Sequence, residues 1–188
     1  KDSISPHMFE ALVATEDSRF YDHCGIDGRA VLRAIVKRGF MGQRSAGGGS
    51  TITQQLAKQL YSSTASNTLQ RLFQKPIEWV IAVELERHYT KEEIMTLYLN
   101  YFDFLHNAVG IKTAAKVYFN KSPKDLSVSE CAMLVGMCKN PAYFNPVREP
   151  ERVQERRNVV LDLMVKGGYL SAAESESLKL TDLGLHFR

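Results

Sequence analysis

Apolar residues recur every three or four positions through nearly the whole chain, and this spacing is the strongest constraint on its fold. In the first segment Phe9, Leu12 and Val13 follow it behind Ser5 and Pro6, a cap residue and a first-turn proline. No run of alternating apolar and polar residues predicts a strand, and the sequence shows no internal repeat. We therefore predict an all-α fold.

Local start and stop signals divide the chain into helices. Thr90 with Glu93 and Ser127 with Glu130 have the spacing of capping boxes, which predicts two helix starts. The glycine pair 167–168 predicts a helix end. In chain order the expected helices begin at Pro6 and then cover about 28–40, 51–61, 77–89, 91–101, 127–140, 149–166 and 171–178.

Composition narrows the class of protein. The chain has 188 residues, 44% of them apolar and 24% charged, which is typical of one globular domain with a real core. A net charge of +3 is too weak to indicate a nucleic-acid partner. Cys24, Cys131 and Cys138 form no CxxC pair, which argues against zinc, and the last two are expected in the core. Because the chain opens at Lys1 without a signal peptide or a membrane-spanning apolar run, we expect a piece of a larger protein.

A carboxylate occupies the apolar face of the first helix. Glu16 lies four residues after Leu12 and three after Val13, so the helix carries its charge on the same stripe. A buried charge is costly unless it is paired or used. Two interpretations stay open: a structural carboxylate paired with Arg19 or a backbone amide, and a proton acceptor whose pKa is raised by apolar surroundings. His23 is expected to have a supporting role.

Glu78 repeats this pattern in a second apolar helix, where Ile77 and Trp79 flank it. Two carboxylates embedded in apolar helices indicate acid–base chemistry on a sugar or a phosphoester. Their spacing along the chain does not establish that they meet in space.

Residues 47–60, GGGSTITQQLAKQL, combine glycines, a helix start and polar side chains. Ser50 or Thr51 is expected as the N-cap, and the preceding glycines allow backbone amides to approach an anion. The polar positions that follow are related by helical offsets of three and four: Gln54, Gln55 and Lys58. No GKS or GKT follows the glycines, so this is not a Walker A loop. From the residues alone, a flexible hinge before an ordinary helix explains the stretch equally well.

Four segments carry a resemblance to a known family: ATEDSRFYDHCGID (14–27), GGSTITQQLAKQL (48–60), KPIE (75–78) and KEEIMTLYLNYF (91–102). In this order they resemble the peptidoglycan glycosyltransferases of family 51, found in monofunctional enzymes and in class A penicillin-binding proteins. Residues 109–146 also fit, and the tail 156–171 is more similar to the bifunctional proteins. The resemblance covers nearly the whole chain, and four motifs in order are highly specific.

The resemblance implies a lysozyme-like helical domain over 1–188, with a smaller, mobile, membrane-facing lobe over about 36–74. It implies polymerisation of lipid II into β-1,4 glycan strands at the outer face of the bacterial cytoplasmic membrane. The implied partners are lipid II, the growing lipid-linked glycan, the membrane surface, an N-terminal transmembrane anchor and a C-terminal transpeptidase domain. A divalent cation, Mg²⁺ or Mn²⁺, is a further expectation, whereas no organic cofactor is expected.

The resemblance also assigns roles. Glu16 would take the proton from the 4-hydroxyl of the incoming lipid II, while Glu78 would lie nearer the diphosphate and orient groups or hold a metal. Inversion by a single displacement needs such a base and positive charge at the leaving diphosphate. The residues expected to line the sugar-diphosphate path are Ser50, Thr51, Gln54, Gln55 and Lys58. Those expected to contact phosphate are Arg19, Arg33, Lys75 and, as a substitute cation, Arg71.

Two departures from the family pattern are expected to weaken binding of the diphosphate. The third motif usually starts Arg-Lys, but this chain has 74–75 as Gln-Lys and Gln70 at another basic position. Asp103 follows YLNYF where the family usually has glycine. Each lost cationic hydrogen bond costs about 1.5–3 kcal/mol of leaving-group stabilisation, which slows the reaction without abolishing it. Pro76 predicts that the helix begins or kinks just before Glu78.

Two other functions compete with this interpretation. A lysozyme-type muramidase or lytic transglycosylase would also use a buried glutamate, but it needs no diphosphate cradle such as Arg33 and Lys58 would supply. A non-catalytic module that binds lipid-linked precursors or docks a partner would tolerate Glu16→Gln. We expect that substitution to abolish polymerisation and to leave lipid II binding intact.

Overall fold

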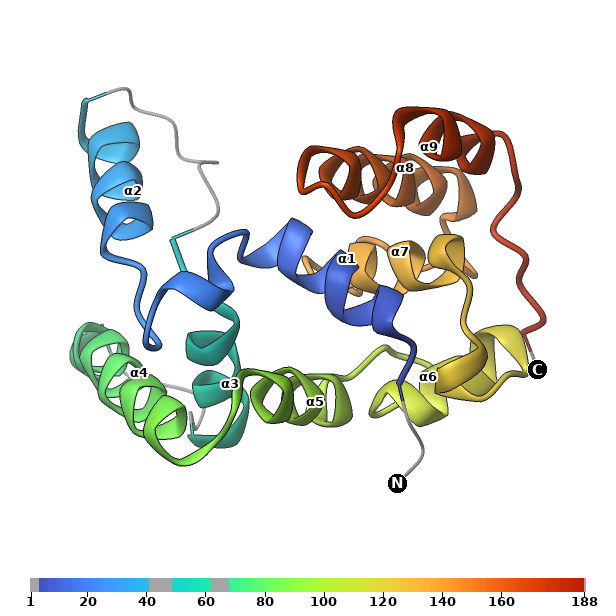
Figure 1. Cartoon of the computed structure of the whole chain (residues 1–188). Coiled ribbons are helices and arrows are strands. Elements are labelled where there is room, and N and C mark those ends of the chain that lie inside the picture. Colours follow the sequence, from blue (N-terminus) through green and yellow to red (C-terminus); the bar gives the residue numbers. More distant parts are fainter. Residues whose placement is uncertain (1–3, 41–48, 62–67, 188) are drawn as a thin grey trace. The chain divides into compact units, whose positions relative to one another are not determined.

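The computed structural model describes residues 4–40, 49–61 and 68–187, and these ranges are helical without a β-strand (Figure 1). Contacts divide the chain into two compact units: Lys1–Ser18 with Leu99–Arg188, and Arg19–Tyr98. The predicted all-α class is confirmed. The elements are α1 (Pro6–Glu16), η1 (Phe20–Asp22), α2 (Gly28–Phe40), α3 (Ile52–Tyr61), α4 (Thr68–His88), α5 (Lys91–Tyr101), α6 (Ile111–Phe119), η2 (Pro123–Asp125), α7 (Val128–Met137), α8 (Pro150–Lys166) and α9 (Ala172–Lys179).

The first unit is built around three helices. α1 packs on both α7 and α8, and α8 also packs on α9 (Figure 1). The apolar stripe of α1 supplies Met8 and Leu12, which are fully buried. α7 is buried along almost its whole length, including Cys131, and Cys138 follows it at 8% exposure. The prediction that these two cysteines are core residues is therefore confirmed.

Short-range capping explains several of the helix starts. Ser127 and Glu130 exchange side-chain and backbone hydrogen bonds as a capping box, and so do Thr90 and Glu93. Both predicted boxes are confirmed. Ser5 is different, because its hydroxyl makes no cap and instead donates to the Leu126 carbonyl at 3.1 Å. Its predicted local role is replaced by a contact with a distant segment.

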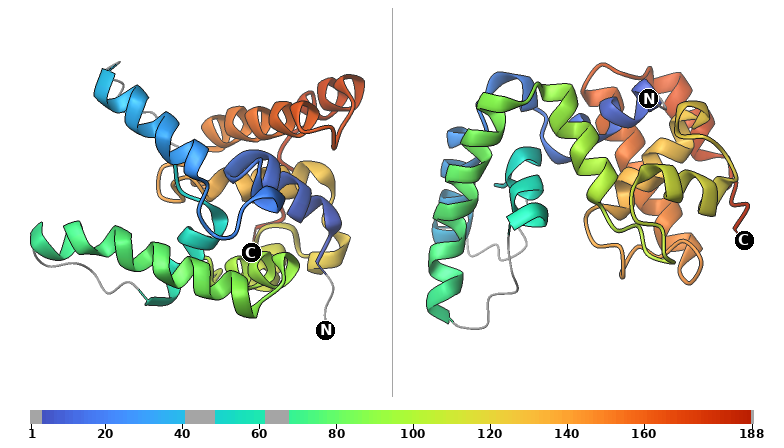
Figure 2. Two further views of the ribbon diagram at one scale, coloured as in Figure 1. Left: turned by 60° about the vertical axis from the view of Figure 1, so that its left-hand side comes forward. Right: turned by 90° about the horizontal axis from the view of Figure 1, so that it is seen from below.

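The second unit contains α2 to α4 and most of α5. α3 lies beside α4 in both views of Figure 2 and packs on it. α4 begins at Thr68 and runs through Pro76, so a helix start just before Glu78 is wrong, whereas the predicted alternative of a kink there stays a prediction. Pro76 itself is exposed, and a proline inside a helix lacks one intrahelical N–H bond.

A tight loop separates α5 from α6 in the first unit. Leu105, His106 and Asn107 have left-handed backbone angles, with φ of 64°, 49° and 61°. The carboxylate of Asp103 accepts the Leu105 N–H at 2.8 Å, so this departure from the family pattern stabilises the turn. Gly110 has φ +82°, and a Cβ there would lie 2.7 Å from the Asn100 oxygen. α6 itself was not predicted from the sequence.

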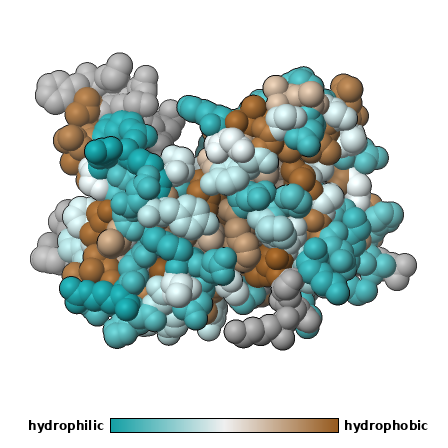
Figure 3. All heavy atoms as spheres, viewed as in Figure 1, coloured by the Kyte–Doolittle hydropathy of each residue, from teal (hydrophilic) through white to brown (hydrophobic). Residues whose placement is uncertain are grey.

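Apolar side chains on α2 face solvent. Leu32, Ile35 and Val36 are 63%, 60% and 43% exposed, and brown surface is visible where Figure 1 places this helix (Figure 3). In the described ranges no helix is both long and apolar enough to cross a bilayer. The smaller lobe predicted over 36–74 falls within the second unit and stays a prediction, because 41–48 and 62–67 lie outside the described residues.

Candidate active site

Glu16 is the last residue of α1. Leu12 and Val13, on the preceding turn, are buried, whereas Glu16 itself is half-buried. Asp17 ends the helix, its N–H donating to the Val13 carbonyl at 3.2 Å. Glu16 therefore lies on the apolar stripe of α1, as the sequence predicts. Because it is the last residue of the helix, part of its side chain is still exposed to solvent.

Glu78 belongs to a polar group in the second unit, which we call the Lys75 group: Lys75, Glu78 and Ser50. Glu78 is 3% exposed, and its Oε2 accepts from Lys75 Nζ at 2.8 Å. The same Nζ donates to Ser50 Oγ at 3.2 Å and so connects α4 to the segment before α3. The Lys75 side chain is 53% exposed. A buried carboxylate thus holds a cation whose outer face can meet an anion.

The start of α3 is held by a reciprocal cap. Thr51 N–H donates to Gln54 Oε1 and Gln54 N–H donates to Thr51 Oγ1, each at 3.1 Å. The Thr51 hydroxyl also donates to the Gly25 carbonyl at 2.7 Å, which ties α3 to the loop before α2. Both side chains are almost fully buried, at 2% and 1%. Thr51, one of the two residues predicted for this role, is therefore the N-cap. Thr51 and Gln54 both position α3; that they line a substrate path stays a prediction.

The remaining residues that were predicted to contact the substrate lie in different surroundings. Gln55 Oε1 accepts from the Tyr98 hydroxyl at 3.1 Å, which connects α3 to α5. Lys58 and Arg33 are exposed, and neither forms an ion pair with another residue of the described ranges. These two cations can therefore meet an anion without breaking an existing pair. The side chain of Arg71 lies outside the described residues.

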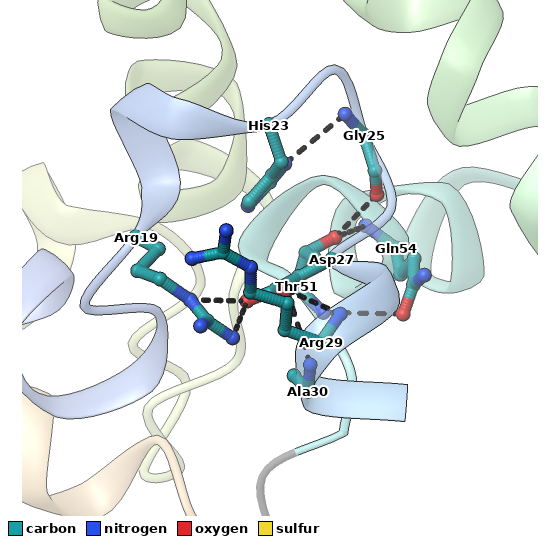
Figure 4. A network of polar contacts seen from close by, with 8 residues as sticks. All are labelled: Arg19, His23, Gly25, Asp27, Arg29, Ala30, Thr51 and Gln54. Atoms are coloured by element: carbon teal, nitrogen blue, oxygen red, sulfur yellow. Dashed lines mark hydrogen bonds and ion pairs between the residues drawn. The ribbon is translucent and has the colours of Figure 1, made fainter. Parts of the chain in front are cut away.

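Arg19 is paired with Asp27 in the loop that leads to α2 (Figure 4). Its Nε and Nη2 donate to Asp27 Oδ2 at 2.9 and 2.6 Å, while Asp27 Oδ1 accepts the N–H groups of Arg29 and Ala30. Burial alone would raise the pKa of Asp27, but the Ala30 and Arg29 amides and the Arg19 side chain lower it below its ordinary value. Asp27 therefore caps α2 as a carboxylate.

A further, partly buried ion pair was not predicted from the sequence. Glu86 Oε1 accepts from Lys91 Nζ at 2.9 Å and from the Thr53 hydroxyl at 2.7 Å. Lys91 Nζ also donates to the His23 carbonyl at 2.6 Å and lies 4.3 Å from the centre of the Phe20 ring. This pair joins α3, α4, α5 and the loop after α1. The spacing of five between its charges crosses a helix break, so helical periodicity could not indicate it.

The carboxylate of Glu78, the residue expected to hold a metal, is paired with a cation. Glu78 Oε2 accepts from the Lys75 ammonium, and among the described residues no three His, Cys, Asp or Glu side chains gather to hold an ion. Mg²⁺ and Mn²⁺ prefer several oxygen ligands. We therefore assign no step to a metal, and the cation expected at Glu78 stays a prediction.

Comparison with known proteins decides the family. A family described as Transglycosylase matches residues 1–165. The chain belongs to the transglycosylase family. This confirms the resemblance drawn from the four motifs and, with it, the predicted enzyme class.

The chain is similar to longer proteins named as penicillin-binding proteins. The chain is 42% identical to penicillin-binding protein 1F of Bacillus subtilis over 185 residues, which is 98% of this chain and 25% of that protein. It is 39% identical to penicillin-binding protein 1A of Escherichia coli over 186 residues, 99% of this chain and 21% of that one. The chain thus spans about a quarter of the length of these relatives.

A solved structure agrees with the helical fold. The crystal structure of penicillin-binding protein 1A from Haemophilus influenzae superposes with a TM-score of 0.50 at 26% sequence identity. The match covers 73% of this chain and 17% of that one. The likeness supports the lysozyme-like helical class predicted from the motifs.

Proposed function

We propose that this chain is a peptidoglycan glycosyltransferase that polymerises lipid II into β-1,4 glycan strands. The observation that carries the proposal is the transglycosylase family match over residues 1–165. The penicillin-binding relatives support a cell-wall substrate and a site of action at the outer face of the cytoplasmic membrane. The expected anchor and transpeptidase domain remain part of this proposal.

In the proposed reaction Glu16 acts as the general base. The 4-hydroxyl oxygen of the incoming lipid II attacks the anomeric carbon of the growing chain, and its proton passes to the Glu16 carboxylate. The bond from that carbon to the undecaprenyl diphosphate breaks with inversion, and the diphosphate leaves with the electron pair. A half-buried carboxylate at a helix end suits this role, because it is partly shielded from water yet accessible.

Positive charge on the second unit would stabilise the leaving diphosphate. Lys75 is held by the buried Glu78 and keeps half of its side chain exposed. Lys58 and Arg33 are exposed on α3 and α2. A pre-positioned cation stabilises developing negative charge without reorganising during the reaction. In this proposal Glu78 orients Lys75 and does not itself transfer a proton.

The test is formation of glycan polymer from purified lipid II. We expect Glu16→Gln to lower the rate by about 10²–10⁴-fold, the usual contribution of a positioned base, while lipid II binding is retained. Glu10→Gln, a partly buried position two turns earlier on α1, serves as the matched control and should retain activity. Unchanged polymerisation by Glu16→Gln would refute the assigned base.

A second measurement separates synthesis from degradation. The chain is incubated with finished peptidoglycan, and the supernatant is analysed for soluble muropeptides. We expect none. Release of soluble sugars would refute the synthase and support a muramidase or lytic transglycosylase instead.

A further inference from the structure

A pocket of about 590 Å³ lies within the second unit, in the stretch that leads into α2. Among the described residues its walls come from the stretch 19–29, and no member of the Lys75 group lines it. A volume of this size is within the usual range for small-ligand sites. Two guanidinium groups, those of Arg19 and Arg29, line it together with two carboxylates, those of Asp22 and Asp27.

The carboxylate of Asp27 already accepts hydrogen bonds at both of its oxygens. The two oxygens of Asp27 accept four N–H bonds, two from the Arg19 side chain and two from the amides that open α2. The Asp27 side chain is only 11% exposed. Its charge therefore balances Arg19 and the start of the helix, and it leaves Arg29 without a counter-charge.

Arg29 provides the cation for a ligand. Its side chain is exposed, and Figure 4 shows its guanidinium extending toward Arg19 and His23. In the part of the chain that the structure describes, no carboxylate lies within ion-pair distance of it. The Gly25 N–H donates to His23 Nδ1 at 3.1 Å, so a neutral His23 carries its proton on Nε2 and adds no negative charge to the pocket.

We infer that this pocket binds an acidic group, phosphate or carboxylate, through Arg29 and the outer edge of Arg19. A guanidinium presents paired N–H donors that match either kind of oxyanion. Asp22, exposed on η1, is the one lining carboxylate that opposes such a ligand, and it limits the affinity. The inference extends the phosphate contact expected of Arg19 in the proposed function by adding Arg29 and a defined pocket, and binding to that pocket is measured without turnover.

The experiment is a two-dimensional ¹H–¹⁵N NMR titration of the 188-residue chain with two probes. Inorganic pyrophosphate represents a diphosphate, and N-acetyl-triglycine represents a peptide whose sole charge is a carboxylate. We expect saturable shifts at residues 22–29 for at least one probe, and the tighter probe identifies the source of the acidic group. If neither probe shifts these amides, or if the shifts are confined to other regions, the inference is overturned whether or not the chain polymerises lipid II.

Two variants test the assigned side chains, and a third serves as the control. Arg29→Gln should weaken binding about tenfold, the effect of losing one charged hydrogen-bonding partner. Asp22→Asn should strengthen binding about two- to fivefold, because it removes the opposing charge. Arg87→Gln, an exposed arginine of α4 outside the pocket, is the control for charge loss and should leave binding unchanged. Equal affinities for wild type, Arg29→Gln and Asp22→Asn would refute the role of this pocket.

Discussion

Two charged centres, one in each unit, are satisfied in opposite ways. Arg157 in the first unit is fully buried and donates to the carbonyls of Lys179, Thr181 and Asp182 and to the side-chain oxygens of Ser129 and Asn158. Burial lowers its pKa, an effect that the nearby Asp182 charge opposes. The Lys75 group of the second unit instead buries its carboxylate and leaves its cation half exposed.

This difference distinguishes a charge that only stabilises the fold from a charge that can bind a ligand. All three guanidinium nitrogens of Arg157 donate to oxygens, either carbonyls at or just after the end of α9 or the side chains of Ser129 and Asn158, so no N–H group remains for a ligand. Lys75 makes two bonds on its inner side, and its exposed part can bind an anion without desolvating a new charge. We therefore expect substitutions at Arg157 to affect stability, and substitutions at Lys75 to affect activity.

The largest expected effect is at Arg157. Arg157→Met should lower the free energy of unfolding by about 3–5 kcal/mol, because several buried oxygens lose their charged donor. Urea denaturation followed by circular dichroism measures the change. Lys166→Met, an exposed site at the end of the same helix, should cost less than about 1 kcal/mol. Equal losses for the two variants would contradict a structural role specific to Arg157.

Lys75 should show the reverse pattern. We expect Lys75→Met to reduce the rate of lipid II polymerisation by about 10–100-fold, through loss of one cation at the leaving diphosphate. The free energy of unfolding should fall by only about 1 kcal/mol, because water reaches the exposed side of the pair. Lys75→Arg should restore part of the activity. A stability loss as large as that of Arg157→Met would remove the contrast between the two centres.

The Asp27–Arg19 pair is a second charge that stabilises the fold, and its contribution to the free energy of unfolding should depend on pH. Because the pKa of Asp27 in the fold is below its ordinary value of 3.8, its carboxylate stabilises the fold fully above that value. This contribution is lost as the pH falls through the lowered pKa. Asp27→Asn keeps a capping oxygen but loses the charge, so it should cost about 1 kcal/mol at pH 7.

Denaturation of wild type and Asp27→Asn at pH 7 and at pH 2 measures this dependence. The difference between them should shrink toward zero at the lower pH. Asp125→Asn, an exposed carboxylate of η2, is the control and should change stability little at either pH. A constant difference for Asp27→Asn would show that its charge does not contribute.

The smallest expected effect is a difference in how readily the cysteines are chemically labelled. Burial raises the pKa of Cys131 to about 12, whereas Cys24 is exposed in the loop before α2. Native protein treated with iodoacetamide at pH 8 should be modified at Cys24 first, with Cys131 and Cys138 reacting only after unfolding. Peptide mass spectrometry measures the order. Early modification of Cys131 would indicate that the core of the first unit opens readily.

Local signals predicted much of the secondary structure. The capping boxes at Thr90 and Ser127 were correct, because their partners lie three residues away and need no other segment. Ser5 shows where this reasoning ends, since its hydroxyl bonds a carbonyl 121 residues later. Pro76 is a further case: a helix breaker by local rules, it lies inside α4, a helix that packs on α3.

In the candidate site, too, some features could be predicted from the sequence and others could not. Glu16, Glu78 and Lys75 could be named from their residue types, their apolar neighbours and the family motifs. The pairing of Arg19 with Asp27, the burial of Thr51 and Gln54, and the Lys91–Glu86 ion pair could not, because each depends on segments that meet only after folding.

The amino-acid sequence alone determined the helical class, most helix starts and the family, because periodicity, caps and ordered motifs act over a few residues. Only the tertiary structure decided which charges are enclosed and which keep a face toward solvent. That choice depends on desolvation, and desolvation is set by every segment that packs around a group.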